Sequence, residues 1–269
     1  MERELKFESP NFAQRIKSMM GVDFYRLFHT PVYYIFLVIA AVIPAMILGT
    51  MGAEGTEQLY TNTWNIIAAE TPLYVVSDMG EYANMNMVFI FGGIMVSIFI
   101  GHDYKSGYVK QLFTTHAKKQ DYMISKTVTC AFAMACMCIT YLLGAVGAGF
   151  YAGTSFEINA GSLVFAILGK MIMSFGWASL YTFLNIIFRK FFGISIASSF
   201  FFGTGILIIG AAAVIGNNFL LNIFLYGSSV YACLSASILT VFVCLVCSLV
   251  WTVIYNVLGT RILSKCDVY

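Results

Sequence analysis

The sequence predicts an all-α integral membrane protein, and three observations support that prediction. Hydrophobic residues make up 59% of the 269 residues and charged residues only 10%, whereas a soluble domain carries about 25% charged residues. The mean hydropathy is +0.82. The apolar residues also gather in runs long enough to cross a bilayer, which takes about 20 residues per helix. So few charges cannot cover a globule in water, which excludes a soluble enzyme and a nucleic-acid-binding protein.

Six apolar runs predict six transmembrane helices. They cover residues 31–50, 85–100, 127–150, 163–188, 193–215 and 232–259. Because an even number of spans returns the chain to the side from which it started, both termini are expected on one side of the membrane. The expected organisation is an N-terminal segment (1–30), a six-helix transmembrane domain (31–259) and a short tail (260–269).

The basic residues predict which side that is. Fourteen of the 15 Lys and Arg residues lie on the side of the termini, in segments 1–30, 101–126, 189–190 and 260–269. The loops on the other side contain none; they are 51–84, 151–161 and 216–231. Since short loops rich in Lys and Arg remain in the cytoplasm, we expect both termini to be cytoplasmic.

Residues 11–30 predict an amphipathic helix in front of the first span. Its apolar side chains recur at helical spacing: Phe12, Ile16, Met19, Met20, Phe24, Leu27 and Phe28. Its charged side chains are placed elsewhere around the helix: Arg15, Lys17, Asp23 and Arg26. This pattern is typical of an interfacial helix lying along the cytoplasmic leaflet. The alternative is a cytoplasmic helix packed against its own protein.

The segment 101–126, between the second and third spans, is too polar to cross the membrane. Tyr104, Tyr108 and Leu112 recur every four residues, followed by Phe113, which predicts a short amphipathic helix on the cytoplasmic side. A helix joined in this way to two long spans is a lever. A partner that pushes on it can tilt both spans.

The same segment resembles the exporter-type permeases of ATP-binding cassette (ABC) transporters in their bacterial six-span form. The resemblance rests on Asp103 at the end of the second span, Gly107 four residues later, the basic and apolar stretch 109–113, and Lys126 at the start of the third span. Residues 22–36 are similarly like the elbow helix of that family, which runs into its first span.

The resemblance implies a permease subunit of the bacterial plasma membrane, with a substrate path between two protomers that are identical or different. A separate cytoplasmic ATPase, which binds ATP and Mg²⁺, would dock on a coupling helix at about 103–114. The implied coupling residues are Asp103, Tyr104, Lys105, Gly107, Tyr108, Lys110, Leu112, Phe113 and Lys126. Independently, the chain has no phosphate-binding loop. No cofactor, metal or catalytic residue is expected in this chain itself.

A more detailed expectation concerns how that helix would meet the ATPase. Tyr104, Tyr108 and Leu112 would fill a cleft on the partner, while Lys105 and Lys110 would meet acidic residues at its rim. Asp103 would cap the helix, and Gly107 would allow a close approach of the backbone.

Lys170 is the only charged residue inside the six apolar runs. A charge at the centre of a membrane helix costs about 2.5 to 3.5 kcal/mol. The long apolar run after Lys170 favours snorkelling, in which the ammonium reaches up to lipid headgroups. In the alternative, Lys170 faces the protomer interface and attracts an anionic substrate group or pairs with an acid such as Glu157.

The expected substrates are amphipathic or antimicrobial-type peptides, or hydrophobic drugs, because short external loops and an apolar path are typical of permeases that export such molecules or give immunity to them. The candidate path residues are Lys170, Phe200, Phe201 and Phe202. An intramembrane enzyme is not favoured, since no His or acid in the spans could activate Ser228 or Ser229. A non-transporting scaffold or sensor that docks a cytoplasmic protein remains the alternative.

Overall fold

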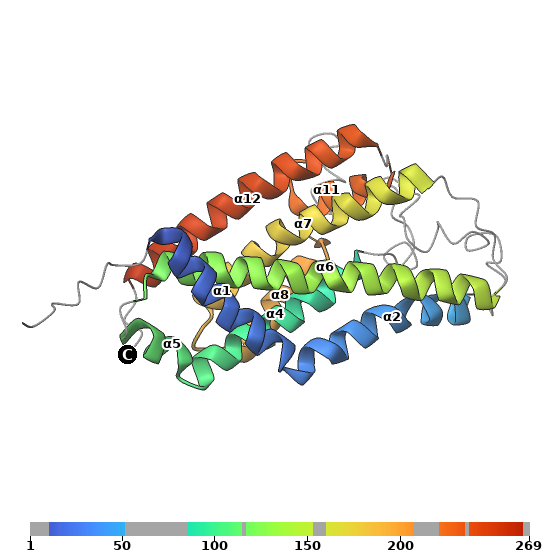
Figure 1. Cartoon of the computed structure of the whole chain (residues 1–269). Coiled ribbons are helices and arrows are strands. Elements are labelled where there is room, and N and C mark those ends of the chain that lie inside the picture. The colour runs from blue at the N-terminus through green and yellow to red at the C-terminus, as the bar shows by residue number, and fades with distance from the viewer. Residues whose placement is uncertain are drawn as a thin grey trace, which may run out of the picture.

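The computed structural model describes residues 11–51, 86–114, 117–152, 160–206, 221–234 and 237–265. All the regular structure in these ranges is helical, in agreement with the predicted fold class. The helices are α1 (Phe12–Phe28), α2 (Pro31–Met51), α4 (Met87–Lys105), α5 (Tyr108–Thr114), α6 (Lys119–Ala152), α7 (Ala160–Ile187), α8 (Phe192–Gly203), α11 (Leu225–Leu234) and α12 (Ile238–Lys265). They form an elongated bundle (Figure 1).

Within the described ranges, four helices are long and apolar enough to cross a membrane: α4, α6, α7 and α12. A fifth candidate is the pair of α1 and α2, which passes the same criteria together and is bent by 66°. The predicted fifth span, 193–215, corresponds in its first half to the shorter helix α8, and residues 207–215 lie outside the described ranges. The count of six spans therefore stays a prediction.

Two predicted boundaries are wrong, because hydropathy measures partition into lipid and does not detect helix ends. Helix α6 begins at Lys119, well before the predicted span start at 127, since the polar residues of that stretch are also compatible with a helix. The predicted span 232–259 is not one helix, because α12 has its own start. There the Ser237 hydroxyl accepts a hydrogen bond from the Thr240 N–H (3.3 Å), the pattern of an N-cap.

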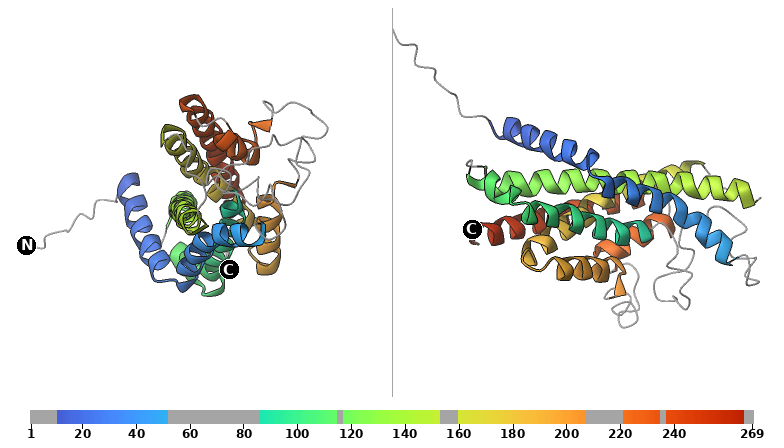
Figure 2. Two further views of the ribbon diagram at one scale, coloured as in Figure 1. Left: turned by 90° about the vertical axis from the view of Figure 1, so that its right-hand side faces the viewer. Right: turned by 90° about the horizontal axis from the view of Figure 1, so that it is seen from below.

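Helix α6 is the centre of the packing. It contacts α1, α2, α4, α7 and α12, and it lies among them in the end-on view (Figure 2, left). Helix α5, the first turns of α6 and the last turns of α12 lie together at one end of the bundle (Figure 1). We call this the basic end, because these elements, the last residue of α4 and the residue before α6 together carry Lys105, Lys110, Lys118, Lys119, Arg261 and Lys265.

The contact between α2 and α6 depends on a glycine. A Cβ atom at Gly144 would lie 2.1 Å from the carbonyl oxygen of Ala41, so no other residue fits there without moving one helix. Small residues allow such close approach between membrane helices. Gly147, one turn further along α6, has open space around the corresponding position.

We predict that Gly144→Ala destabilises the protein by about 1–3 kcal/mol, because the added methyl group forces α2 away from α6. Gly147→Ala is the matched control and should leave stability unchanged or raise it by up to about 1 kcal/mol, since Gly is unfavourable inside a helix. Unfolding of both variants in mixed detergent micelles, followed by circular dichroism, measures the difference. Equal stability of the two variants would contradict the packing described above.

Candidate functional site

Helix α1 carries an acidic side chain into the protein. Its inward stripe contains Ile16, Met19, Asp23 and Leu27, which recur at helical spacing, and the last two are buried. The sequence pattern placed Asp23 among the charged residues elsewhere on the helix. That placement is wrong, because the stripe that packs against α6 includes Asp23.

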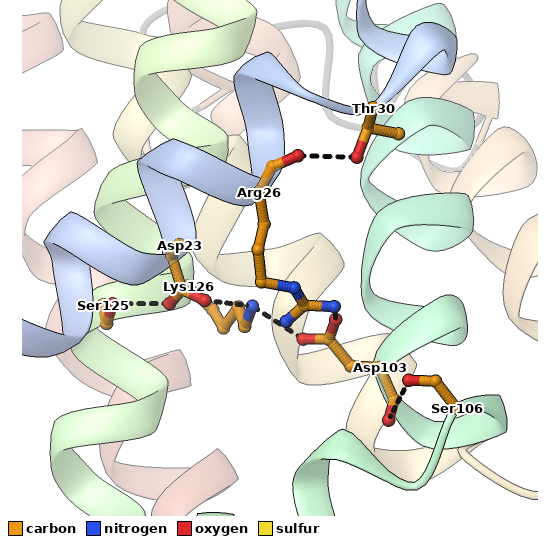
Figure 3. A network of polar contacts seen from close by, with 7 residues as sticks. All are labelled: Asp23, Arg26, Thr30, Asp103, Ser106, Ser125 and Lys126. Carbon is orange, nitrogen blue, oxygen red and sulfur yellow. Dashed lines mark hydrogen bonds and ion pairs between the residues drawn. The ribbon is translucent and has the colours of Figure 1, made fainter.

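The partner of Asp23 is Lys126 on α6. The Lys126 Nζ lies 2.5 Å from Asp23 Oδ1 and 2.6 Å from Asp103 Oδ2, and all three side chains are fully buried. The Ser125 hydroxyl donates a second hydrogen bond to Asp23, at 2.6 Å. One ammonium group therefore joins α1, α4 and α6 (Figure 3).

Arg26 on α1 completes the group, which we call the charged cluster: Asp23, Arg26, Asp103 and Lys126. The Arg26 guanidinium lies 2.5 Å from Asp103 Oδ1 and 4.0 Å from the centre of the Tyr108 ring. Burial of Tyr108, together with the nearby carboxylate of Asp23, raises the pKa of the Tyr108 hydroxyl above its ordinary value. The ring face of Tyr108 meets the cation of Arg26, a cation–π contact.

The charged cluster has two cations and two carboxylates, so its formal charge sums to zero. A balanced set of charges can be buried, but each member depends on the others, because removing one leaves an uncompensated charge in a region of low dielectric constant. A second ion pair, between Arg15 and Asp121 at 2.8 Å, also links α1 to the start of α6.

Helix α5 leaves α4 through a sharp turn at Ser106 and Gly107. Gly107 has φ of +73°, a left-handed conformation that suits glycine, and no atom lies within 4 Å of the position its Cβ would occupy. Gly107 is therefore explained by the conformation of the turn. The expected close approach of another backbone is not seen at this position. The predicted helix 103–114 is thus two helices, in which Asp103 belongs to α4 and its carboxylate pairs with cations.

The structure places the predicted coupling residues on two sides of α5. Val109 is buried, Leu112 packs against the same small apolar cluster, and the Phe113 ring meets the Tyr122 ring edge to face at 5.7 Å. Lys105 and Lys110 are exposed. The apolar side chains of α5 therefore contact their own protein, and the face left for a partner is polar. Docking of an ATPase here stays a prediction.

Lys170 on α7 is fully buried, so the snorkelling interpretation is wrong for this structure. Its ammonium group donates a hydrogen bond to Asn86 Oδ1 and lies 5.8 Å from the centre of the Phe89 ring. The long stem of Lys170 points between α4 and α7, since both partners belong to the start of α4. Phe200, Phe201 and Phe202, which were predicted as path residues together with Lys170, belong to α8.

The three predicted path phenylalanines of α8, Phe200, Phe201 and Phe202, are partly exposed. Phe201 and Phe202 line a groove of about 310 Å³ between α7, α8, α11 and α12. Most of its other lining side chains are aromatic or aliphatic: Trp177, Leu180, Phe224, Leu225, Tyr226, Trp251 and Tyr255. The volume suits a drug-sized apolar group. Phe200 is not part of the lining, and neither is Lys170.

Two residues of the charged cluster, Asp103 and Lys126, were predicted as coupling residues, and the structure brings them together. Asp23 and Arg26 were missed. One feature of the sequence could have indicated that Asp23 faces inward. It is the only acid in the predicted amphipathic helix, and it lies three or four residues from its apolar neighbours.

We predict that Lys126→Met lowers the free energy of unfolding by about 3–5 kcal/mol, because it leaves two buried carboxylates without their shared cation. Adding Asp23→Asn should restore part of this loss. The control is Lys118→Met, an exposed lysine of the same segment, which should be neutral. Unfolding titrations of the four proteins in mixed micelles provide the measurement, and an unchanged stability of Lys126→Met would contradict the ion pairing.

The comparisons with known proteins fit this arrangement. A family model described as ABC-2 family transporter protein matches residues 22–203. The matched region runs from the second half of α1 to the end of α8 and contains the whole charged cluster and α5. Comparison with curated proteins and with solved structures gives no match. Because the family match covers more than half of the chain, this protein belongs to the ABC-2 transporter family.

Proposed function

We propose that this chain is the permease subunit of an ATP-driven exporter and that a separate ATPase drives it by docking on α5. The observation that carries the proposal is the position of α5. This helix presents a polar face at the basic end, and its other face is fixed to the charged cluster through Tyr108. Membership of the ABC-2 family supports a role in membrane transport.

The charged cluster would transmit a push on α5 to the helices around it. A push on α5 acts on α4 through the turn at Gly107, and it acts on α1 through the contact of Tyr108 with Arg26. Because Lys126 holds α1 and α4 to α6, the three helices move together and α5 does not move alone. Coupling between distant sites needs such an element with contiguous packed and paired side chains.

The substrate would pass between two permease protomers, identical or different, in a bacterial plasma membrane. The aromatic groove beside Phe201 and Phe202 supports amphipathic peptides or hydrophobic drugs as cargo, since it offers apolar surface and contains no charged lining residue. Resistance to a panel of membrane-active peptides, in cells with and without the ATPase, tests this class. A scaffold or sensor would bind its partner without changing resistance.

The orientation follows from the basic end, which we place in the cytoplasm. We predict that Ser106→Cys at this end is protected from an impermeant thiol reagent in intact cells and that Tyr151→Cys, which is 96% exposed at the other end of α6, is labelled. The native cysteines, replaced beforehand by Ala or Ser, provide the unreactive background. Labelling of Ser106→Cys with protection of Tyr151→Cys would reverse the orientation.

Docking is tested at the exposed face of α5. We predict that Lys110→Glu combined with Gln111→Glu slows association with the ATPase about tenfold, because charges at an interface rim govern the approach of a partner. The matched control is Arg261→Glu with Ser264→Glu, which makes the same charge change on exposed residues at the end of α12. Surface plasmon resonance against purified ABC-type ATPases from the same cell measures binding. Equal effects of the two pairs would place the docking site elsewhere.

A further inference from the structure

A small pocket at the basic end is not used by the proposed coupling mechanism. It lies where the end of α4 meets the turn between α7 and α8, and its volume is about 150 Å³. The lining residues are Gly101, Tyr104, Lys105, Asn185, Phe188, Arg189, Lys190, Phe192 and Ser195. Drug-sized ligands occupy pockets of about 300–1,000 Å³, so this one suits a smaller group.

Three cations converge on the pocket from two elements. Lys105 comes from α4, while Arg189 and Lys190 come from the turn after α7, and none of the lining residues is acidic. In the described part of the chain neither Arg189 nor Lys190 is paired with a carboxylate. The acid nearest to Lys105 in the sequence is Asp103, whose carboxylate forms ion pairs with Arg26 and Lys126. Among the described residues, therefore, nothing compensates the charge of the pocket.

The start of α8 adds to this positive potential. The helix begins at Phe192, and its N-cap residue, Phe191, has an apolar side chain that makes no capping hydrogen bond. A helix start of this kind favours an anion. The Phe192 ring also holds the Lys105 ammonium at the pocket, with Nζ 3.9 Å from the ring centre.

The polar floor of the pocket is already satisfied. Asn185 and Ser195 hydrogen-bond to each other, and Asn185 also donates to Ser97 Oγ (3.1 Å) and to the Tyr181 carbonyl (2.8 Å). An occupant therefore binds through the three cations and the start of α8. This donor set matches the oxygen atoms of a phosphate group.

The surface beside the pocket distinguishes a lipid from a free phosphate. Ile194, Ala197 and Phe201 lie at helical spacing on α8 and are all exposed. This apolar stripe starts next to the cations and runs along α8 away from the basic end. A cationic pocket at one end of an exposed apolar stripe matches a molecule with an anionic head and acyl chains. Basic pockets between membrane helices bind anionic lipid headgroups in this way.

We propose that this pocket binds the phosphate of an anionic phospholipid, with the acyl chains along the exposed stripe of α8. The site is separate from the polar face of α5, so it does not depend on the docking of an ATPase. The lipid supplies the negative charge that Arg189 and Lys190 lack in the described part of the chain, and it joins α4 to α8 at the level of the headgroups.

The test uses the full-length protein in neutral detergent micelles, titrated with phosphatidylglycerol or with phosphatidylcholine and followed by native mass spectrometry. The wild type should retain phosphatidylglycerol in preference to phosphatidylcholine. Arg189→Gln with Lys190→Gln should weaken phosphatidylglycerol binding about 30-fold, which corresponds to two cations near a headgroup. Arg189→Lys should keep binding, because it keeps the charge.

The matched control is Arg261→Gln with Lys265→Gln, which removes two exposed cations from the same end of the bundle. This variant should bind phosphatidylglycerol like the wild type. Equal losses in the two double variants would overturn the proposal, since attraction would then be general and not local. Displacement of the lipid by millimolar inorganic phosphate would also overturn it, because the ligand would then be a free phosphate.

Discussion

The ammonium group of Lys126 constrains the whole basic end. It lies between the carboxylates of Asp23 and Asp103, which belong to two other helices, and none of the three side chains is exposed. Each carboxylate can be buried only while a cation neutralises it. The angle at which α1 crosses α6 and the point at which α4 ends are therefore set by one shared ion pair. Arg26 balances the remaining charge.

This constraint explains how a helix as short as α5 can have a fixed geometry and transmit a force. A seven-residue helix is too short to be stable alone, so its geometry depends on what its inner face contacts. Tyr108 meets Arg26, Val109 is buried, and Phe113 meets Tyr122. Through these contacts α5 is fixed to the same helices that the charged cluster joins. A force applied to its polar face would therefore reach α1, α4 and α6 together.

The sequence was most informative where one physical property dominates. Apolar runs located α2 and α7 within a few residues at both ends, because burial in lipid requires continuous hydrophobicity. It was less informative where polar side chains act. The pairing of Asp23 with Lys126 joins residues 103 positions apart, and no periodicity encodes such a contact. The break before α12 depends on one hydroxyl of Ser237, which hydropathy does not register.

The two buried lysines differ in a way that bears on transport. Lys126 has two carboxylates, whereas Lys170 has an amide oxygen of Asn86 and the face of Phe89, and within the described ranges no carboxylate lies at ion-pair distance from it. An amide dipole does not cancel the charge of an ammonium, so Asn86 does not balance Lys170 in the way that Asp23 and Asp103 balance Lys126. In the proposed exporter, an acidic group of the substrate would complete at Lys170 the balance that Asp23 and Asp103 provide at Lys126.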